Sequence, residues 1–529
     1  MSDLDAIIIG AGHNGLTCAA YLGMAGLRVR VLERRDIVGG ACVTEEFYPG
    51  FRNSTAAYTV SLLQSKIIRD LKLQQRGLRI VERRAQNFLP LPDGRYLVAA
   101  EGRTEREIAK FSVTDAARYP AYQAEISRVA SVLRSIVLDA PPNLVLGNIG
   151  QGVRDLGKVA AVGKTLWRDG GFKAALRLLR RSAGDILDGW FDSDPIKALL
   201  GFDAVVGNFA SPYTPGSGYV LLHHVFGEVN GKAGVWGHAV GGMGAITKAM
   251  ASAATEHGVR IDVSAPVRGI IVERGRAAGV VLQDGTPVRA RTVIANVDPQ
   301  QLLQTLVPRE MIPRAVDARM QRWKAGSATF RMNVALSKLP DFSALPGAGD
   351  HLTAGIILAP SLAYMDQAYR DCVNDGWSRA PIIEMLIPSM LDDSLAPPGA
   401  HVASLFCQHV APRFADGASW EQHRETVADL MIDTVETFAP GFKASVIGRQ
   451  SLSPLDLERI FGLPNGDIFH GALTLDQLYA ARPMLGYAAY RMPLAGLYLC
   501  GSGAHPGGGV TGAPGHNAAQ AVIADLLPK

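Results

Sequence analysis

The sequence predicts an α/β fold that opens with a Rossmann-like dinucleotide-binding unit and returns to that unit later in the chain. Three observations support this: a strand, glycine loop and helix near the start, a second such unit at the end, and a β-rich stretch at residues 237–300 between them. With 529 residues, nearly half of them hydrophobic, the chain is long enough for two or three domains or for one large interleaved pair.

The first unit is the stretch DAIIIGAGHNGLTCAAYLGMAGLRVRVLE at residues 5–33. A short apolar strand precedes the motif Gly10-x-Gly12-x-x-Gly15, a helical pattern follows, and a second strand ends in Glu33. Gly10 permits the tight turn, Gly12 lets the backbone approach a pyrophosphate, and Gly15 lets the helix pack on the strand. The helix N-terminus favours an anion, and Glu33 is placed to bind ribose hydroxyls. A structural βαβ unit without a ligand is the alternative, and the complete fingerprint argues against it.

The residues after this unit decide between FAD and NAD. The doublet Gly39-Gly40 follows, and in flavoproteins of the glutathione-reductase type such a doublet after the acidic residue continues the FAD site. We therefore expect FAD. Those flavoproteins usually have Arg next, where this chain has Ala41, so a cation over the pyrophosphate has to come from elsewhere, with Arg34 and Arg35 as candidates. The chain has no second GxGxxG motif, which indicates that the flavin is the only bound redox cofactor.

The last unit is the stretch LYLCGSGAHPGGGVTGAPGHNAAQAVIADLL at residues 497–527. A strand leads into a glycine-rich loop, and a helix is expected from about His516. A helix N-terminus directed at the N1–C2=O region of a flavin would stabilise the negative charge of the reduced ring. Residues 507–509 keep side chains away from the ring, while Val510 and Thr511 would contact it. A flexible loop before an ordinary helix is the alternative, which the matching unit at the other end of the chain disfavours.

The predicted cofactor contacts extend over three segments of the chain. In two-dinucleotide-fold flavoproteins a strand like the one at Val267 carries a backbone contact to adenine, and this adds the middle segment. The full set is Gly10, Gly12, His13, Asn14, Gly15, Glu33, Arg34, Gly39, Gly40, Ala41, Val267, Gly501, Ser502, Gly509, Val510, Thr511 and Gly512.

Residues 154–181 form a basic stretch with interleaved aromatic and aliphatic residues. It holds eight Lys or Arg and only two Asp. A basic amphipathic helix can lie on an anionic membrane, and this is one interpretation. The other is a lid helix whose charges are simply solvated. Ahead of it, residues 90–98 predict a hairpin, and a helical pattern from 104 to 138 indicates a domain boundary near residue 100.

Composition excludes several classes of protein. The net charge of +4 is too small to indicate nucleic-acid binding. The five cysteines lack any C-x-x-C spacing, so we expect neither a zinc site nor a redox dithiol, and we expect buried free thiols in a reducing compartment. The start carries no signal-peptide pattern, and no apolar run is long enough to span a membrane. A cytoplasmic protein, in contact with a membrane surface or free of it, is the expectation.

Five stretches carry a resemblance to a known family: IIIGAGHNGLTCAAYL, SPYTPGSGYVLLHHVFGE, GGMGAITKAMASAATEHG, LPNGDIFHGALTLDQLYAARP and LYLCGSGAHPGGGVTGAPGHNAA. Together they span nearly the whole chain. The sequence resembles the phytoene-desaturase-like flavoproteins, which include carotenoid isomerases and retinol saturase. The tail motif is most similar to the branch named pyridine nucleotide-disulphide oxidoreductase domain-containing protein 2. Where flavin relatives often have an acidic residue after the glycine of the tail strand, this chain has Ser502.

The resemblance implies a two-dinucleotide-binding-domain flavoprotein with an interleaved α+β substrate domain. The FAD domain would comprise residues 1–98, 237–300 and 485–529, and the substrate or membrane-associating domain residues 99–236 and 301–484. It also implies a long apolar tunnel that leads to the isoalloxazine ring.

The expected reaction is oxidation, saturation or isomerisation at C–C bonds of a long isoprenoid or lipid-like substrate by hydride exchange with flavin N5. A regulatory protein that holds FAD without turnover is one alternative. A flavin amine oxidase is another, and it would need an aromatic pair that faces the flavin. Hydride transfer depends on position and dryness more than on a base, so no catalytic residue is assigned. The candidate histidines are His223, His224, His238, His470 and His505, of which His505 lies within the flavin loop.

Overall fold

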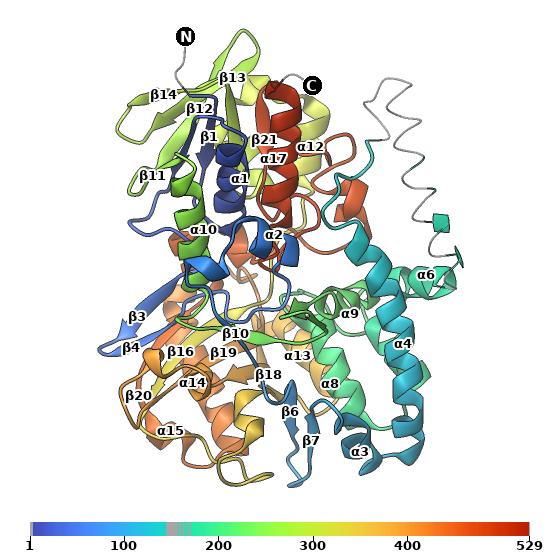
Figure 1. The fold of residues 1–529 in the computed structure, drawn as a ribbon. Coiled ribbons are helices and arrows are strands. Elements are labelled where there is room, and N and C mark those ends of the chain that lie inside the picture. The colour runs from blue at the N-terminus through green and yellow to red at the C-terminus, as the bar shows by residue number, and fades with distance from the viewer. Residues whose placement is uncertain are drawn as a thin grey trace.

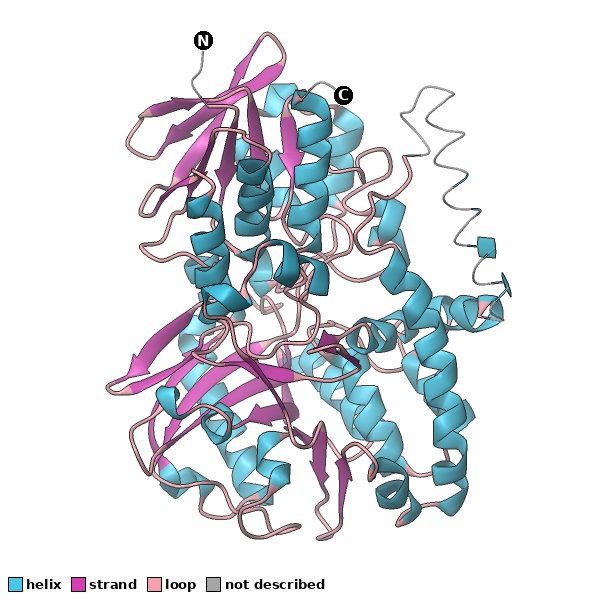
Figure 2. Cartoon of the chain, in the orientation of Figure 1, coloured by secondary structure: helices cyan, strands magenta, loops and turns pink. Residues whose placement is uncertain are grey.

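Two sheets form the two ends of the molecule in the computed structural model, which describes residues 4–143 and 171–527 and six positions between them (157, 160, 163, 164, 167 and 168). A five-stranded sheet with both chain termini lies at one end, and a seven-stranded sheet at the other (Figure 1). A group of helices flanks the second sheet, so that the lower half of the molecule divides into a sheet region and a helical region (Figure 2).

The five-stranded sheet joins the beginning, the middle and the end of the chain. All of its neighbouring strands are parallel. Because both faces of such a sheet are covered, its strands are continuously apolar, as AIII in the first strand illustrates. The strand order is β11 (Arg260–Asp262), β2 (Val29–Leu32), β1 (Ala6–Ile9), β15 (Thr292–Ala295) and β21 (Leu497–Leu499).

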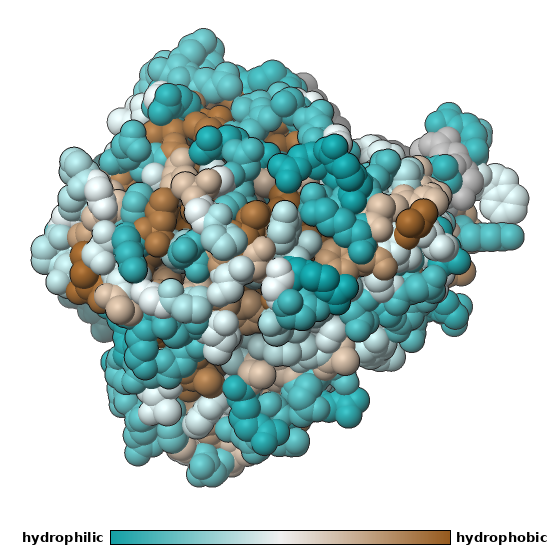
Figure 3. All heavy atoms as spheres, turned by 90° about the horizontal axis from the view of Figure 1, so that it is seen from below, coloured by the Kyte–Doolittle hydropathy of each residue, from teal (hydrophilic) through white to brown (hydrophobic). Residues whose placement is uncertain are grey.

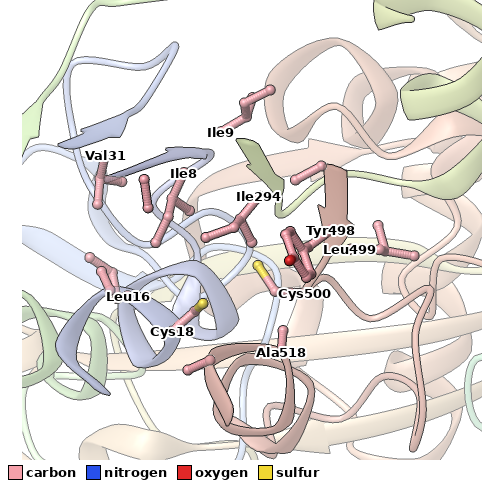
Figure 4. Close-up of a cluster of buried hydrophobic side chains, with 14 of the residues drawn as sticks. Ile8, Ile9, Leu16, Cys18, Val31, Ile294, Tyr498, Leu499, Cys500 and Ala518 are labelled. Carbon is pink, nitrogen blue, oxygen red and sulfur yellow. The ribbon is translucent and has the colours of Figure 1, made fainter. Parts of the chain in front are cut away.

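The two predicted strand–loop–helix units lie side by side, because β15 alone separates β1 from β21. Their helices, α1 (His13–Met24) and α17 (Ala513–Leu526), approach so closely that a Cβ at Gly515 would lie 2.1 Å from the carbonyl oxygen of Asn14. Figure 4 shows Leu16 and Cys18 of α1 and Ala518 of α17 directed at the same apolar cluster. The last helix begins at Ala513, three residues before the predicted start at His516.

The seven-stranded sheet separates two further hydrophobic clusters. Helix α14 (Trp420–Phe438) covers one face, and helices α8 (Asp194–Val205) and α13 (Leu362–Asp375) contribute to the cluster on the other. Only one pair of neighbours, β17 with β6, is parallel. The strand order is β20 (Val446–Leu452), β16 (Phe330–Leu336), β19 (His401–Val410), β18 (Trp377–Leu386), β17 (Gly355–Leu358), β6 (Asn87–Pro90) and β7 (Tyr96–Ala99).

The predicted hairpin near residues 90–98 is present as β6 and β7, but it belongs to the second sheet. The resemblance predicts it as part of the dinucleotide-binding domain, whose first segment comprises residues 1–98. The parallel pairing of Asn87 with Gly355 in β17 draws the hairpin to the other end of the molecule. The chain therefore changes sheets before residue 87, and the remaining domain boundaries stay a prediction.

The remaining elements connect and cover these two sheets. They are β3 (Thr44–Tyr48), β4 (Phe51–Ser54), α2 (Ser65–Asp70), β5 (Ile80–Glu82), α3 (Thr104–Ala109), α4 (Val113–Ser135), α6 (Phe172–Arg180), α7 (Ala183–Trp190), α9 (Gly218–Val225), β8 (Glu228–Val229), β9 (Lys232–Ala233), β10 (Gly237–Ala239), α10 (Gly244–Glu256), β12 (Val267–Glu273), β13 (Arg276–Leu282), β14 (Pro287–Arg289), α11 (Pro299–Gln301), α12 (Arg314–Gln321), α15 (Phe442–Ser445) and α16 (Pro454–Phe461).

The basic stretch is described only at its C-terminal end and at isolated positions before it. Most of residues 154–170 lie outside the described residues, so the interpretation of that part stays a prediction. Helix α6 buries Ala174, Ala175 and Leu178, and it exposes Phe172 and Leu176, each 44% accessible. Figure 3 shows the face seen from below as mainly hydrophilic, with hydrophobic side chains in separate small areas. No helix within the described ranges is long and apolar enough to cross a membrane.

Candidate cofactor and active site

One cavity of about 410 Å³ connects the two sheets. Its lining begins at the carboxyl ends of β1 and β2 with Ile9 and Leu32, and reaches Phe406 of β19 in the seven-stranded sheet. In sheets of this kind ligands bind outside the carboxyl ends of the parallel strands. The cavity therefore occupies the expected place for a dinucleotide, with room beyond it for a substrate.

The glycines of the first motif leave no space for side chains. Gly10 has a φ of +94°, a conformation that favours glycine. A Cβ at Gly12 would lie 2.9 Å from Asn296 Nδ2, and one at Gly15 would lie 2.2 Å from the carbonyl oxygen of Gly10. Gly10 and Gly12 line the cavity, whereas Gly15 serves the contact between helix and strand, as its predicted task requires.

Asn296 is a site residue that sequence reasoning missed. It follows β15, lines the cavity, and donates a hydrogen bond of 3.2 Å from Nδ2 to the carbonyl oxygen of Gly10. A polar residue directly after a buried parallel strand was the available signal, because the carboxyl ends of such strands meet at one edge.

Glu33 is buried, and its carboxylate fixes the glycine loop. Oε2 accepts a hydrogen bond of 2.8 Å from the backbone N–H of Ala11, and Oε1 accepts one of 3.0 Å from the N–H of Arg35. The same carboxylate lines the cavity beside Pro266 and Val267, as expected for a residue that meets a ribose.

The two arginines after Glu33 line the cavity but have partners within the protein. Arg34 Nη2 donates to the carbonyl oxygens of Arg459 at 3.1 Å and Ile460 at 2.5 Å, in the last turn of α16. Arg35 donates to Glu45 at 2.7 Å and lies over the ring of Phe461. Arg35 Nη1 is buried without a partner, so the role of these arginines at the pyrophosphate stays a prediction.

The C-terminal loop meets the N-terminal unit at the cavity. Ser502 Oγ accepts a hydrogen bond of 3.3 Å from Asn14 Nδ2, and Ser502, Gly509 and Val510 line the cavity. Thr511 does not line the cavity, and its hydroxyl accepts a hydrogen bond of 3.1 Å from the N–H of Ala513, the first residue of α17. Helix α17 thus begins directly after the cavity wall, and its N-terminal partial positive charge faces that region.

The structure brings most of the predicted cofactor residues to this one cavity. Gly10, Gly12, His13, Glu33, Arg34, Gly40, Ala41, Val267, Ser502, Gly509 and Val510 line it. The other six predicted residues are not among the lining residues: Asn14, Gly15, Gly39, Gly501, Thr511 and Gly512.

His505 does not line the cavity, contrary to its position within the flavin loop. Its Nε2 donates to the carbonyl oxygen of Ile136 at 3.2 Å, and its ring meets that of Tyr479 edge-on. Burial lowers the pKa of His505 to about 4. These contacts favour the structural role over the catalytic one.

The other candidate histidines differ in whether they line the cavity. His238 contacts Asp392 at 3.0 Å away from the cavity lining. The side chains of His223 and His224, in α9, lie outside the described residues. His470 lines the cavity, and so does His13.

His13 and His470 present nitrogen atoms without partners. His13 Nε2 and His470 Nδ1 are buried and form no hydrogen bond within the protein. Burial lowers the pKa of His13 to about 3 and that of His470 to about 4, so both rings are neutral at physiological pH. Buried polar atoms of this kind call for a ligand that supplies the missing hydrogen bonds. Together with the glycine loop and Glu33, they fit a bound FAD.

The wall toward the seven-stranded sheet is aromatic and uncharged. Tyr58, Trp236 and Phe406 line it, and the rings of Tyr58 and Phe406 stack with centroids 5.2 Å apart. Among the described residues that line the cavity, charged side chains occur only at positions 33–35, at the ribose end. The remainder of the cavity offers apolar surface and hydroxyl groups.

The cysteines are free and buried, as predicted. Burial raises the pKa of Cys42 to about 12, so that thiol is unreactive. Within the described ranges no group of three or more His, Cys, Asp or Glu side chains is arranged to hold a metal ion.

A parallel sheet with two glycine-loop helices that converge on one cavity defines an FAD-dependent oxidoreductase. A family model described as flavin containing amine oxidoreductase matches residues 15–330, more than half of the chain, and the chain belongs to this family. The cofactor is FAD, as predicted.

Curated proteins that match nearly the whole length of this chain narrow the family resemblance. Pyridine nucleotide-disulfide oxidoreductase domain-containing protein 2 of Rattus norvegicus is 44% identical over 99% of this chain and 94% of its own length. A limonene dehydrogenase subunit of Castellaniella defragrans is 27% identical, over 99% and 95%. Phytoene desaturase (neurosporene-forming) of Cereibacter sphaeroides is 25% identical, over 100% and 96%. The predicted resemblance to phytoene-desaturase-like flavoproteins is confirmed.

The fold has solved counterparts. A putrescine oxidase triple mutant superposes with a TM-score of 0.63 at 17% identity, over 99% of this chain and 98% of that one. The likeness is one of fold, and it confirms the predicted α/β fold class.

Proposed function

We propose that this protein is an FAD-dependent oxidoreductase that acts on C–C bonds of a long apolar isoprenoid or lipid-like substrate. The observation that carries this proposal is the uncharged aromatic wall of the cavity, opposite the ribose end. An apolar chain gains about 25 cal/mol for each Å² that it removes from water, so the aromatic surface favours the hydrocarbon part of a substrate. Two relatives are named for limonene and phytoene, which are hydrocarbons, and this supports the same substrate class.

The residues at the nucleotide end would hold the cofactor. The loop with Gly10 and Gly12 provides close approach of the backbone, and Glu33 offers its carboxylate to ribose hydroxyls. When bound, the flavin supplies an acceptor or donor of hydride. The chain's own contribution is to orient the substrate and exclude water, and the neutral rings of His13 and His470 add hydrogen-bonding capacity without charge.

Amine oxidation has less support in the geometry. It calls for an aromatic pair that faces the flavin with space for an amine between the rings. Tyr58 and Phe406 are stacked at 5.2 Å, which leaves no such space. The wall they form also lacks a carboxylate within the described lining that would attract a protonated amine.

We also infer that the protein contacts a membrane surface through α6. This helix exposes Phe172 and Leu176 next to Lys173 and Arg180, a combination that suits an anionic lipid surface.

Product analysis tests the proposed reaction. The FAD-loaded protein is incubated with limonene, squalene or geranylgeraniol and a quinone acceptor, and the extracted lipid is examined by mass spectrometry. Desaturation lowers the mass of the substrate by two hydrogens, saturation with a reduced flavin raises it by two, and isomerisation changes only the chromatographic position. Unaltered lipid for every probe under both redox conditions would favour the regulatory FAD-holding alternative.

A further inference from the structure

A cluster of buried ionic side chains lies directly behind the aromatic wall of the cavity. Arg83, Arg331 and Glu384 are each at least 94% buried. Glu384 accepts a hydrogen bond of 2.5 Å from the hydroxyl of Tyr58, and its other oxygen lies 3.9 Å from Arg83 Nη1. The cluster therefore touches the cavity wall through Tyr58.

Arg331 is a buried cation without an ion pair among the described residues. Its Nη1 donates to the carbonyl oxygen of Leu405 and its Nη2 to Ser404 Oγ, both at 2.7 Å, while Nε has no partner. Its guanidinium lies 4.5 Å from the centroid of the Tyr58 ring. Burial of a charge without a counter-charge is costly, so a residue placed this way calls for a compensating function.

The acidic groups nearby do not balance the two arginines. Glu384 compensates one positive charge. Asp203 of α8 is the other acid that interacts with this region, and burial together with the charge of Glu384 raises its pKa to about 8. Asp203 is therefore mainly protonated at neutral pH. One positive charge remains uncompensated behind the wall.

Hydroxyl groups connect this charge to the cavity. Arg83 Nη2 donates to Thr59 Oγ1 at 2.7 Å, and Thr59 lines the cavity beside Tyr58. Ser61 also lines the cavity, and its buried Oγ has no hydrogen-bond partner. A Cβ at Gly227 would lie 1.6 Å from that oxygen, so the absence of a side chain at 227 makes room for it.

We propose that the wall formed by Tyr58, Thr59 and Ser61 binds the terminal carboxylate of a long apolar substrate. The substrate would then be an isoprenoid or fatty acid rather than a pure hydrocarbon. This inference rests on the proposed function and specifies its substrate class. A carboxylate carries the single negative charge that balances the excess of one, whereas a phosphate monoester carries up to two. The hydroxyls of Tyr58 and Thr59 already donate to Glu384 and to the carbonyl oxygen of Gly237, so Ser61 Oγ supplies the hydrogen bond to the carboxylate. Arg83 and Arg331 supply the positive electrostatic potential.

Matched probes of one chain length test this. Oleic acid, oleyl alcohol and methyl oleate are titrated into the FAD-loaded protein, with the flavin absorbance bands and the heat of binding as readouts. We expect roughly tenfold or greater preference for the acid, since a hydrogen bond to a charged group contributes about 1.5–3 kcal/mol. Equal affinities of the three probes would overturn the inference and leave the proposed function standing. If none of them binds, and limonene, squalene and geranylgeraniol also fail, the proposed function itself fails.

Variants test which residues cause the preference for oleic acid. Arg331→Met should remove the advantage of the acid while oleyl alcohol binds as before, and Arg331→Lys should keep part of it. Ser61→Ala and Thr59→Val test the same wall if the buried arginine proves necessary for folding, which thermal unfolding reveals. Arg95→Met, at an exposed side chain (63% accessible), is the matched control. An undiminished preference for the acid in both Ser61→Ala and Thr59→Val would contradict this assignment.

Discussion

The guanidinium of Arg34 donates a hydrogen bond of 2.5 Å to the carbonyl oxygen of Ile460. Arg34 follows the second strand of the dinucleotide-binding unit, and Ile460 lies in the last turn of α16. The final carbonyls of a helix lack partners within it, and a cation there is favourable. Phe461, the last residue of this helix, and Gly462 and Leu463 after it line the cavity. The hydrogen bonds of Arg34 thus hold the C-terminal end of α16 beside the expected nucleotide site.

Loss of the hydrogen bonds between Arg34 and α16 should weaken the binding of FAD. We expect Arg34→Met to speed FAD dissociation about tenfold, since it removes two hydrogen bonds from a charged donor. The recovery of free FAD fluorescence after dilution measures the rate. Arg309→Met, at a side chain that is 86% exposed, serves as control. Equal rates for Arg34→Met and the unmodified protein would show that α16 does not retain FAD.

A methyl group at Gly12 should interfere with cofactor binding. Its Cβ would meet Asn296 Nδ2 at 2.9 Å, at the point where the backbone is to approach the pyrophosphate. We expect Gly12→Ala to purify with much less FAD, as judged from the flavin absorbance per protein. Gly189→Ala, in α7 with open space around it, should keep its FAD and gain up to about 1 kcal/mol in stability. A full FAD content in Gly12→Ala would contradict the assigned role of this loop.

The buried histidines should make stability depend on pH. Burial lowers the pKa of His409 to about 3 and that of His505 to about 4. An unfolded histidine takes up a proton near pH 6.5, whereas these two stay neutral in the fold, so the unfolded state binds more protons between about pH 6.5 and 4. Stability therefore falls as the pH falls through this window, by about 1.4 kcal/mol per pH unit for each residue.

Denaturant unfolding of the FAD-loaded protein at pH 7.5, 5.5 and 4.5 measures this dependence. Neither ring nitrogen of His409 has a partner, so His409→Phe removes the titrating group without breaking a hydrogen bond. The free energy of unfolding of His409→Phe should fall less steeply with falling pH, by about 1.4 kcal/mol per pH unit, which is the contribution of one histidine. The prediction fails if variant and unmodified protein lose stability in parallel.

Binding of the carboxylate probe should weaken in alkali. Asp203 is protonated below its pKa of about 8 and negative above it, where it cancels the excess positive charge behind the wall. Tyr119 and Tyr122 of α4 and Glu384 of β18 are the titratable groups that interact with it, and burial raises the pKa of both tyrosines. We expect the affinity for oleic acid to decline from pH 7 to 9, and Asp203→Asn to bind equally at both. An unchanged decline in the variant would exclude Asp203 as its cause.

Membrane contact through α6 is measurable by sedimentation with vesicles. Phe172→Ser combined with Leu176→Ser should reduce binding to vesicles that contain phosphatidylserine, because both exposed side chains would otherwise enter the lipid interface. Val373→Ser replaces a residue that is 54% exposed on α13 and should bind like the unmodified protein. Equal sedimentation of all three proteins would argue against this surface.

The sequence allowed the nucleotide end of the site to be predicted, since its residues are adjacent along the chain. Gly10, Gly12 and Glu33 lie within one βαβ unit, whose spacing follows from the chemistry of a dinucleotide. The opposite wall could not be predicted in this way. Tyr58 and Phe406 are almost 350 positions apart, and only the tertiary fold places the loop after β4, which holds Tyr58, against β19, which holds Phe406.

The histidines illustrate the same limit. His505 stands among the glycines of the flavin loop, yet its side chain turns to the carbonyl of Ile136. His470 lies in the stretch LPNGDIFHG, whose spacing does not show where the side chain points. It lines the cavity, and Asp467 binds the N–H groups of Phe469 and Gly471 on either side of it. Side-chain direction within a loop depends on such local hydrogen bonds, which sequence spacing does not reveal.

Anaerobic spectroscopy of the flavin tests the central claim most directly. The FAD-loaded protein is mixed without oxygen with limonene, squalene, geranylgeraniol or oleic acid, and in parallel with putrescine, while the oxidised flavin bands are recorded. We expect at least one of these apolar compounds to bleach or shift the flavin bands, and putrescine to leave them unchanged. Bleaching by putrescine alone would contradict it and identify an amine oxidase instead.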